Sequence, residues 1–410
     1  MVNRLVSFFN NSFLFSKFQF GFLKRKSTSD ALTELVESIY ASLNERKYHI
    51  SVLIDLTKAF DSVNHGILLS KMKMYGITGN SFNLFKSYLC DRKAFVKIGE
   101  SCSSMKTGNI GVPQGSIIGP ILFLIYINDL PNVSQLLQTV MFADDTTFSS
   151  SHHDHDTLID RLNVELETIS SWCASNRLTL NTKKTELLLF TKRPTAHSNR
   201  QVILGNETLS VKNSCTFLGT KLDVQLNFSH HIKYVTNKLS KSLGILFKIR
   251  NSLPMEARLN YYYAFIYPYL SYNVISWGGT NRSHLLPLIV LQKRIIRTIC
   301  DCKRFDHTSP LFHRLHLLKL DDLFKYSVSI YMHGAMKDDY FSVSHHVNTR
   351  RRDLAVPTFH RLTVSQQALS YIGPTTWNQL PSFLRNINSL PTFKNSLKNY
   401  LIEQYIPNPN

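Results

Sequence analysis

The sequence predicts a mixed α/β domain followed by a mainly helical C-terminal region, and three observations support this. Residues 30–46 place apolar side chains at helical spacing and lead directly into the strand-like run SVLIDL. The segment QTVMFADDTTFSS alternates like two short strands, with a pair of aspartates between them. Residues 255–410 are rich in Tyr, Leu, Arg and His and have a helical pattern. The two halves therefore differ in class.

The remaining elements of the first half follow from local patterns. After Phe60 the apolar residues return to a helical period that ends near Gly76. The loop IGVPQGSIIGP opens an apolar helix, ILFLIYINDL, and residues 157–176 form an amphipathic helix. Strands and turns are expected over residues 178–190 and 216–222. The α/β domain should close near residue 225.

The second half begins with a helix whose two faces differ in character. Its apolar stripe consists of Ile232, Val235, Leu239, Leu243 and Leu246. Lysines lie mostly off that stripe, namely Lys233, Lys238, Lys241 and Lys248. Such a helix offers one face to a core and one to phosphates. Further on, the basic run NTRRRD (348–353) suggests a linker or exposed loop.

The composition favours a polyanionic partner. The 410 residues include 47 Lys and Arg against 28 Asp and Glu, a net charge of +19 that is spread along the chain. The Phe-rich start is interrupted by charged and amide residues, so we expect no secretory signal. No apolar run reaches the ~20 residues of a spanning helix. Six scattered cysteines fit reduced thiols in an intracellular protein.

Three aspartates are candidates for a metal site. The adjacent pair Asp144 and Asp145 repel each other and lose hydration in a half-buried hairpin, and a divalent cation would remove that cost. A solvated hairpin tip is the alternative for such a pair in isolation. Asp55, however, ends another apolar strand, and the loop VPQGS lies between the two sites in sequence. Carboxylates that converge from separate strands could hold two metal ions ~3.5–4 Å apart.

These segments together resemble a known family. DLTKAFDSVNH, GVPQGSIIGPILFLIYINDLP, FADDTTF, WCASNRLTLNTKKTELLLF and FLGTKLD occur in the order seen in reverse transcriptases of non-LTR, LINE-like retrotransposons. Upstream, QFGFLKRKST resembles the family's fingers motif. YPYLSYNVISWG and GPTTWNQLP are similar to the region after the thumb in the jockey and CR1-like groups. The resemblance covers nearly the whole chain.

The resemblance implies a right-hand polymerase fold. Fingers and palm would occupy residues 1–225, the thumb 226–295, and a helical basic region 296–410. Asp55 and Asp144 would be the principal ligands of two Mg²⁺ ions, with Mn²⁺ as a possible substitute. Asp145 would complete the acidic turn, and the backbone carbonyl of Leu56 would add a ligand.

Further roles follow from the same resemblance. Phe60 would lie beneath the sugar and exclude a ribose 2′-hydroxyl, although a core Phe is the alternative. Gln114 and Gly115 would lie against the incoming nucleotide and the template, where glycine permits close approach, unless they form only a structural turn. Lys184 falls near a lysine that protonates the departing pyrophosphate as a general acid. Because Lys183 is adjacent and surface lysines are abundant, an ordinary surface lysine is the alternative.

A basic segment near the start is placed close to the triphosphate by the fingers resemblance. Lys24, Arg25 and Lys26 would neutralise charge that develops during phosphoryl transfer. Many relatives have Arg where this chain has Leu23, which leaves open which cation acts. A solvated basic turn is the alternative.

The expected activity is RNA-directed DNA polymerisation, with an RNA template, a DNA primer and deoxynucleoside triphosphates as partners. We expect it in the nucleus or cytoplasm and find no indication of its oligomeric state. The chain begins shortly before QFGF, so we expect it to lack part of the fingers and the endonuclease domain. A catalytically silent remnant that at most binds RNA is therefore the alternative. A two-metal nuclease is disfavoured by Phe60 and the VPQGS loop.

Overall fold

The computed structural model describes residues 1–90, 92–193, 200–336, 354–358, 360, 362 and 365–406. The chain forms two compact units. Unit 1 comprises Met1–Ala31 and Arg46–Asn213, and unit 2 comprises Leu32–Glu45 and Ser214–Asn410. The domain limits expected from the sequence remain predictions, and the expected loop at 348–353 lies outside the described residues. Within the described ranges, no helix is long and apolar enough to cross a membrane.

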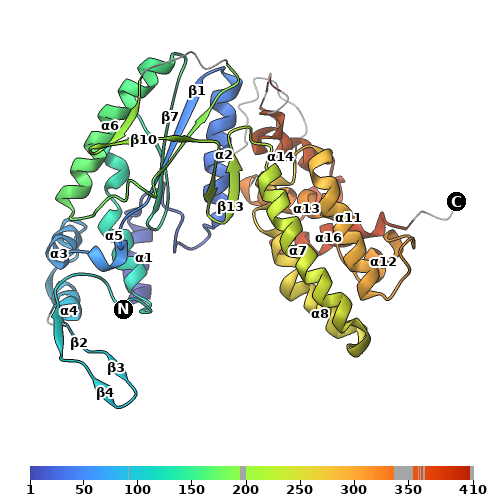
Figure 1. Cartoon of the computed structure of the whole chain (residues 1–410), viewed down its shortest axis with the longest axis horizontal. Coiled ribbons are helices and arrows are strands. Elements are labelled where there is room, and N and C mark those ends of the chain that lie inside the picture. Colours follow the sequence, from blue (N-terminus) through green and yellow to red (C-terminus); the bar gives the residue numbers. More distant parts are fainter. Residues whose placement is uncertain are drawn as a thin grey trace. The chain divides into compact units, whose positions relative to one another are not determined.

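Unit 1 is built on a five-stranded sheet of order β11-β8-β1-β7-β6 (Figure 1). The sheet strands are β1 (Tyr48–Ile54), β6 (Gln138–Phe142), β7 (Asp145–His152), β8 (Glu186–Phe190) and β11 (Val211–Lys212). The smaller strands are β2 (Arg92–Ala94), β3 (Lys97–Ile98), β4 (Ser101–Cys102), β5 (Lys106–Gly108), β9 (Val202–Leu204) and β10 (Glu207–Leu209). Four of the sheet strands pair antiparallel, and β11 joins β8 in parallel.

Five helices of unit 1 surround this sheet or extend from it. They are α1 (Val2–Asn11), α3 (His65–Met74), α4 (Gly79–Leu89), α5 (Gly119–Ile127) and α6 (His155–Ser175). Helix α5 is buried along almost its whole length, which explains its unbroken apolar sequence. Helix α6 packs its apolar face on β7, and its first turn is capped by the Asp154 carboxylate, which accepts from the Thr157 amide. One core therefore lies between these helices and the strands.

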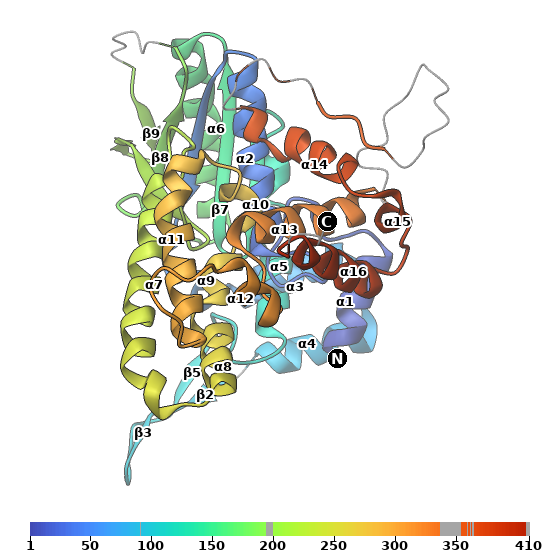
Figure 2. The same ribbon diagram turned by 90° about the vertical axis from the view of Figure 1, so that its right-hand side faces the viewer.

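Unit 2 is mainly helical, as the sequence predicts, and includes one hairpin. Its elements are α2 (Thr28–Asn44, most of which belongs here), β12 (Ser214–Phe217), β13 (Thr220–Asp223), α7 (Ser229–Ile249), α8 (Met255–Phe265), α9 (Tyr267–Ser271), α10 (Val274–Trp277), α11 (Arg282–Ile299), α12 (Ser309–Arg314), α13 (Leu320–Ala335), α14 (Leu369–Asn378), α15 (Ser382–Arg385) and α16 (Leu390–Glu403) (Figure 2). Helix α7 packs on α11 and on β13.

The predicted stripe of α7 is confirmed. Its five apolar residues are buried, whereas the four lysines that lie off the stripe are exposed. The entry to α7 is fixed by the buried Asp223, whose carboxylate accepts from the amides of Gln225, Asn227 and Phe228 at 3.1, 3.2 and 2.8 Å. This carboxylate satisfies backbone donors that would otherwise be buried without partners. The turn that connects the hairpin β12–β13 to the helix is thereby held in place.

Candidate active site

The three candidate acids converge where β1 and β7 meet. In the antiparallel pairing of these strands Ile54 lies opposite Thr146, and the same register places Asp55 opposite Asp145. Asp144 is in the turn between β6 and β7, one residue earlier. The hairpin with acids at its tip is thus confirmed. Asp55 and Asp145, ninety positions apart in sequence, meet because the two strands are neighbours in the sheet.

The electrostatics show that these carboxylates share one environment. Burial raises the pKa of Asp144, and the nearby charge of Asp55 raises it further. Burial also raises the pKa of Asp145, with additional contributions from Asp144 and then Asp55. Three like charges in a partly desolvated pocket disfavour their own ionisation. A cation bound there would reverse this effect.

The three carboxylates fit a metal ion that takes most of its ligands from water and substrate. Across the parts of the chain that the structure describes, no three His, Cys, Asp or Glu side chains form a ready-made metal cage. Mg²⁺ usually keeps several waters and substrate oxygens and needs only one or two carboxylates from the protein. The paired strand ends and the Leu56 carbonyl can supply that smaller set.

The backbone around Asp55 is held from the side of β8. The Asp55 carbonyl accepts from the amide of Asn181, and the Thr57 amide donates to the carbonyl of Thr179, both at 2.8 Å. These two bonds flank an isolated bridge between Leu56 and Leu180. In this type of antiparallel pair the residue at the centre makes no bond to its partner. The Leu56 carbonyl is therefore not used by the bridge.

The turn that carries Asp144 is held by Gln19, which the sequence analysis did not single out. Its side chain is buried, and its Oε1 accepts from the amides of Ala143 at 2.9 Å and Gly21 at 2.7 Å. Ala143 has a φ of 55°, a left-handed conformation that is uncommon for residues other than glycine. The hydrogen bond to Gln19 helps to hold this strained residue. The signal in the sequence is the QFGF segment, whose resemblance to the fingers motif does not indicate this contact.

Gly21 permits the close approach of the two segments. The backbone of residues 18–20 pairs in parallel with Met141, so the chain passes directly beside the acidic turn. A Cβ atom on Gly21 would stand 2.5 Å from the amide nitrogen of Ala143, which is shorter than real contacts allow. Only glycine fits here without displacement of the turn.

Phe60 lies between the buried helix α5 and the surface of unit 1. Its ring stacks on Phe123 of α5, with centroids 4.4 Å apart and an interplanar angle of 26°. On another side the exposed ring of Phe22 approaches it edge-on at 6.5 Å. Phe60 itself is only half-buried. It is thus a rigidly supported aromatic surface that retains an open side.

The loop with Gln114 and Gly115 is tied to the same short segment. The backbone amide of Val112 donates to the Phe60 carbonyl at 2.9 Å, and the side-chain Nε2 of Gln114 donates to the Asp61 carboxylate at 2.8 Å. Gly115 is exposed and has a φ of 79°. The structure therefore brings Phe60, Gln114 and Gly115 together. Asp61 is a contributor that the sequence analysis missed.

The candidate cations are distributed differently. Lys184 is exposed on the turn that leads into β8, a turn that begins at Asn181 and so contacts Asp55. Lys24 and Arg25 are also exposed. The Lys26 ammonium donates to the carbonyls of Lys17 and Gln19, both at 2.7 Å, and lies 4.7 Å from the centre of the Phe20 ring. Lys26 therefore closes the loop that positions Gln19.

Comparison with known proteins identifies the family. Residues 1–222 match the family described as "Reverse transcriptase (RNA-dependent DNA polymerase)". Because this match spans more than half of the chain, the protein belongs to that family and has its fold. The family predicted from the sequence motifs is thus confirmed.

Two similar relatives are from Drosophila melanogaster. The "Probable RNA-directed DNA polymerase from transposon BS" is 28% identical over 363 residues, which cover 86% of this chain and 39% of the relative. The "RNA-directed DNA polymerase from mobile element jockey" is 26% identical over 342 residues, which cover 81% of this chain and 37% of the relative. The chain thus spans less than two fifths of either relative's length.

A weaker likeness links the chain to a solved structure, that of apo telomerase from Candida tropicalis. The TM-score is 0.43 at 12% identity, and the likeness covers 84% of this chain and 59% of the other. A value this low carries no argument about the site.

Replacement of Gly21 by alanine should destabilise unit 1. The added methyl group would meet the Ala143 backbone, and such overpacking typically lowers the free energy of unfolding by about 1–3 kcal/mol. Chemical denaturation followed by circular dichroism measures the change. Gly108→Ala is the control, because a Cβ at Gly108 has no neighbour within 4 Å. Equal stability of the two variants would contradict the close approach.

Asp144→Asn should stabilise the metal-free protein at neutral pH. A carboxyl whose pKa is raised in the folded state binds protons more readily there than in the unfolded chain, so its unfavourable contribution appears as pH rises. The gain should be present at pH 7.5 and should shrink as pH falls toward the unfolded value of about 3.9. Thermal unfolding in a chelator at both pH values measures it.

Asp160→Asn is the matched control for this measurement. Asp160 pairs with Arg200 at the surface, so its replacement should give no gain at either pH. A lower melting temperature for Asp144→Asn in metal-free buffer at pH 7.5 would show that the acids do not repel one another as the geometry implies.

Proposed function

We propose that this protein copies RNA into DNA as the polymerase part of a non-LTR retrotransposon. The observation that carries the proposal is the convergence of Asp55, Asp144 and Asp145 at the ends of paired strands. The family match and the relatives from mobile elements support the reaction type. The reaction joins a primer 3′-hydroxyl to the α-phosphate of a deoxynucleoside triphosphate and releases pyrophosphate.

The acids would hold two Mg²⁺ ions, or Mn²⁺ in their place. When bound, such ions lower the pKa of an attacking hydroxyl and stabilise charge on the leaving group. Asp55, Asp144 and the Leu56 carbonyl would be the ligands, and Asp145 would keep the turn acidic. Strand pairing holds these groups in place before substrate arrives, so little reorganisation accompanies the reaction.

Phe60 and the neighbouring loop would select the nucleotide. The Phe60 ring is fixed from below by Phe123, so it cannot move aside for an additional ribose oxygen. Gln114 and Gly115 would lie against the base and the template, and the left-handed glycine leaves room for close backbone approach. Their attachment to the Phe60 segment keeps the two parts in register.

Cationic side chains would bind the triphosphate and the departing pyrophosphate. Lys184 is the proposed donor of a proton to the departing pyrophosphate, and its exposure leaves its ammonium accessible. Lys24 and Arg25 would neutralise the triphosphate. Lys26 would act mainly through its bonds to the backbone of Lys17 and Gln19.

The lysine face of α7 would grip an RNA template and DNA primer through their phosphates. Its four lysines are exposed while the opposite stripe is buried, so the charge is available to a polyanion. Binding of this kind weakens steeply with salt. We propose a location in the nucleus or cytoplasm, where such a template would be met.

The decisive experiment measures extension of a DNA primer on an RNA template with Mg²⁺ and labelled deoxynucleotides. Asp144→Ala should reduce extension by at least about 100-fold, because one of few metal ligands is lost. Asp160→Ala, which removes a surface carboxylate, should extend as the wild type does. No extension by wild type beside retained, salt-sensitive RNA binding would instead support a silent RNA-binding remnant.

Phe60→Ala should relax the choice of sugar. Without the ring, a 2′-hydroxyl has space, and discrimination against ribonucleotides should fall by about 10-fold or more. Single-nucleotide extension with matched deoxy- and ribonucleotides gives the ratio of kcat/KM values. Phe22→Ala is the control, since this ring contacts Phe60 only edge-on. Unchanged discrimination in Phe60→Ala would leave Phe60 as a core residue.

A further inference from the structure

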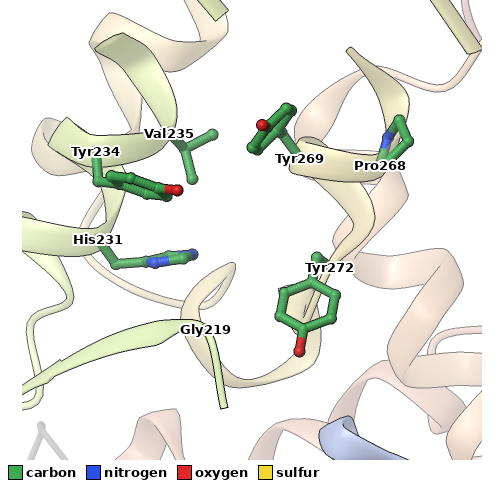
Figure 3. Close-up of a pocket in the computed structure, with 7 residues that line it drawn as sticks. All are labelled: Gly219, His231, Tyr234, Val235, Pro268, Tyr269 and Tyr272. Atoms are coloured by element: carbon green, nitrogen blue, oxygen red, sulfur yellow. The ribbon is translucent and has the colours of Figure 1, made fainter. Parts of the chain in front are cut away.

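Unit 2 contains a pocket that the proposed reaction does not use. It has a volume of about 220 Å³ and is lined by Gly219, His231, Tyr234, Val235, Pro268, Tyr269 and Tyr272. Figure 3 shows His231, Tyr234 and Val235 of α7 on one wall and the residues around α9 on the other. The volume lies below the roughly 300–1,000 Å³ of pockets for drug-sized ligands. It suits a single flat ring system.

The pocket is held open by the turn between β12 and β13. Gly219 has a φ of 76°, and a Cβ atom there would stand 3.4 Å from the Tyr272 ring. The Tyr272 hydroxyl donates to the Leu218 carbonyl at 2.8 Å, which ties this turn to the end of α9. Asn273 adds a second tie through its side-chain amide, which donates to Thr220 at 2.9 Å. The walls are therefore fixed without a ligand.

His231 presents an unused donor on this wall. The Lys221 amide donates to its Nδ1 at 3.4 Å, which leaves the ring proton on Nε2. Nε2 is buried and has no hydrogen-bond partner in the described part of the chain, and the ring points toward the space between the walls (Figure 3). Burial lowers the pKa of His231 to about 4, so the ring is neutral at physiological pH. Buried donors without partners are rare in folded proteins.

The other polar groups of the pocket are uncharged. Figure 3 shows the hydroxyls of Tyr234 and Tyr269 directed toward the same space from opposite walls. None of the lining side chains is a carboxylate or an ammonium group. A pocket with aromatic walls and a few hydrogen-bonding groups suits an uncharged ligand whose flat ring carries polar atoms along its edge.

Positive charge lies just beside the pocket. The ammonium groups of Lys221 and Lys238 are 5.2 and 5.5 Å from the centre of the Tyr234 ring. A ligand that enters beside Tyr234 therefore carries its anionic groups into a cationic surrounding. Uncharged aromatic pockets flanked by cations are typical of proteins that stack single bases and contact the adjoining backbone.

We propose that this pocket binds one unpaired nucleobase of a single-stranded nucleic acid, while Lys221 and Lys238 contact the adjoining phosphates. The base stacks against Tyr234 and displaces the ammonium groups that lie over this ring in the free protein. The Nε2 proton of His231 donates to an acceptor on the edge of the base. A paired base cannot enter, because its edge is already bonded and its faces are covered by neighbours. Lys238 belongs to the lysine face of α7, so the inference rests on the nucleic-acid binding in the proposed function, but it involves none of the acidic residues.

The test uses the full chain and a fluorescein-labelled ten-nucleotide oligoadenylate, without metal or nucleotides, followed by fluorescence anisotropy. Tyr234→Ala should weaken binding by about 5- to 150-fold, the range found for loss of a stacking platform. Tyr234→Phe keeps the ring and should keep most of the affinity. Affinity for a blunt RNA duplex of equal charge should be the same in all variants.

Tyr263→Ala is the matched control. Like Tyr234, Tyr263 is a tyrosine on a helix of unit 2, but it lies on α8 and does not line the pocket. Equal oligoadenylate binding by wild type and Tyr234→Ala, or an equal loss in Tyr263→Ala, would overturn the proposal. So would a proline-rich peptide whose binding depends on Tyr234 while RNA binding does not.

The primer-extension assay, run in parallel, separates this inference from the proposed function. Tyr234-dependent binding of oligoadenylate in a protein that extends no primer would retain the pocket and remove the polymerase. Extension by a wild type whose binding is indifferent to Tyr234 would do the opposite. A melting temperature for Tyr234→Ala within a few degrees of wild type excludes unfolding as the cause of lost binding.

Discussion

The pairing of β1 with β7 holds like charges together against their own repulsion, and the rest of unit 1 depends on it. Asp55 directly follows β1 and Asp145 begins the neighbouring β7, so their separation is fixed by backbone hydrogen bonds rather than by their side chains. The apolar residues of these strands are buried in one core with α5 and α6. A slip of one residue would turn that apolar set outward, so burial fixes the register. The positions of the aspartates are therefore fixed, because a change of register would expose the apolar residues of β1 and β7.

Support for this cluster comes from segments that carry no acid themselves. Gln19 holds the left-handed turn at Ala143 from one side, and the bonds at Asn181 and Thr179 hold the Asp55 backbone from the other. Each of these supports bonds to the backbone of an acidic segment. None of them occupies a carboxylate oxygen of the three aspartates. Groups arranged in this way are available to a cation and to substrate.

Aromatic packing serves different purposes in the two units. In unit 1 the stacking of Phe60 on Phe123 makes a surface residue as rigid as the core beneath it. In unit 2 the tyrosines around α9 are kept apart from α7 by the turn at Gly219, so that aromatic faces border a space instead of closing on one another. Trp277, fully buried and 5.5 Å from the His231 ring, prevents that wall from collapsing inward. The Nε2 of His231 on this wall has no hydrogen-bond partner among the described residues, and a bound ligand would supply one.

The sequence by itself determined the elements whose pattern is local. The stripe of α7, the buried helix α5 and the hairpin with acids at its tip follow from periodicity and from turn chemistry, which read neighbours along the chain. The order of motifs also identified the family. Only the tertiary structure showed that Gln19 supports Ala143, 124 positions away, that Asp61 holds Gln114, and that Lys26 bonds to nearby carbonyls. The sequence alone could not reveal the tyrosine pocket either, because contacts between distant segments depend on how whole elements pack, and no local pattern encodes that.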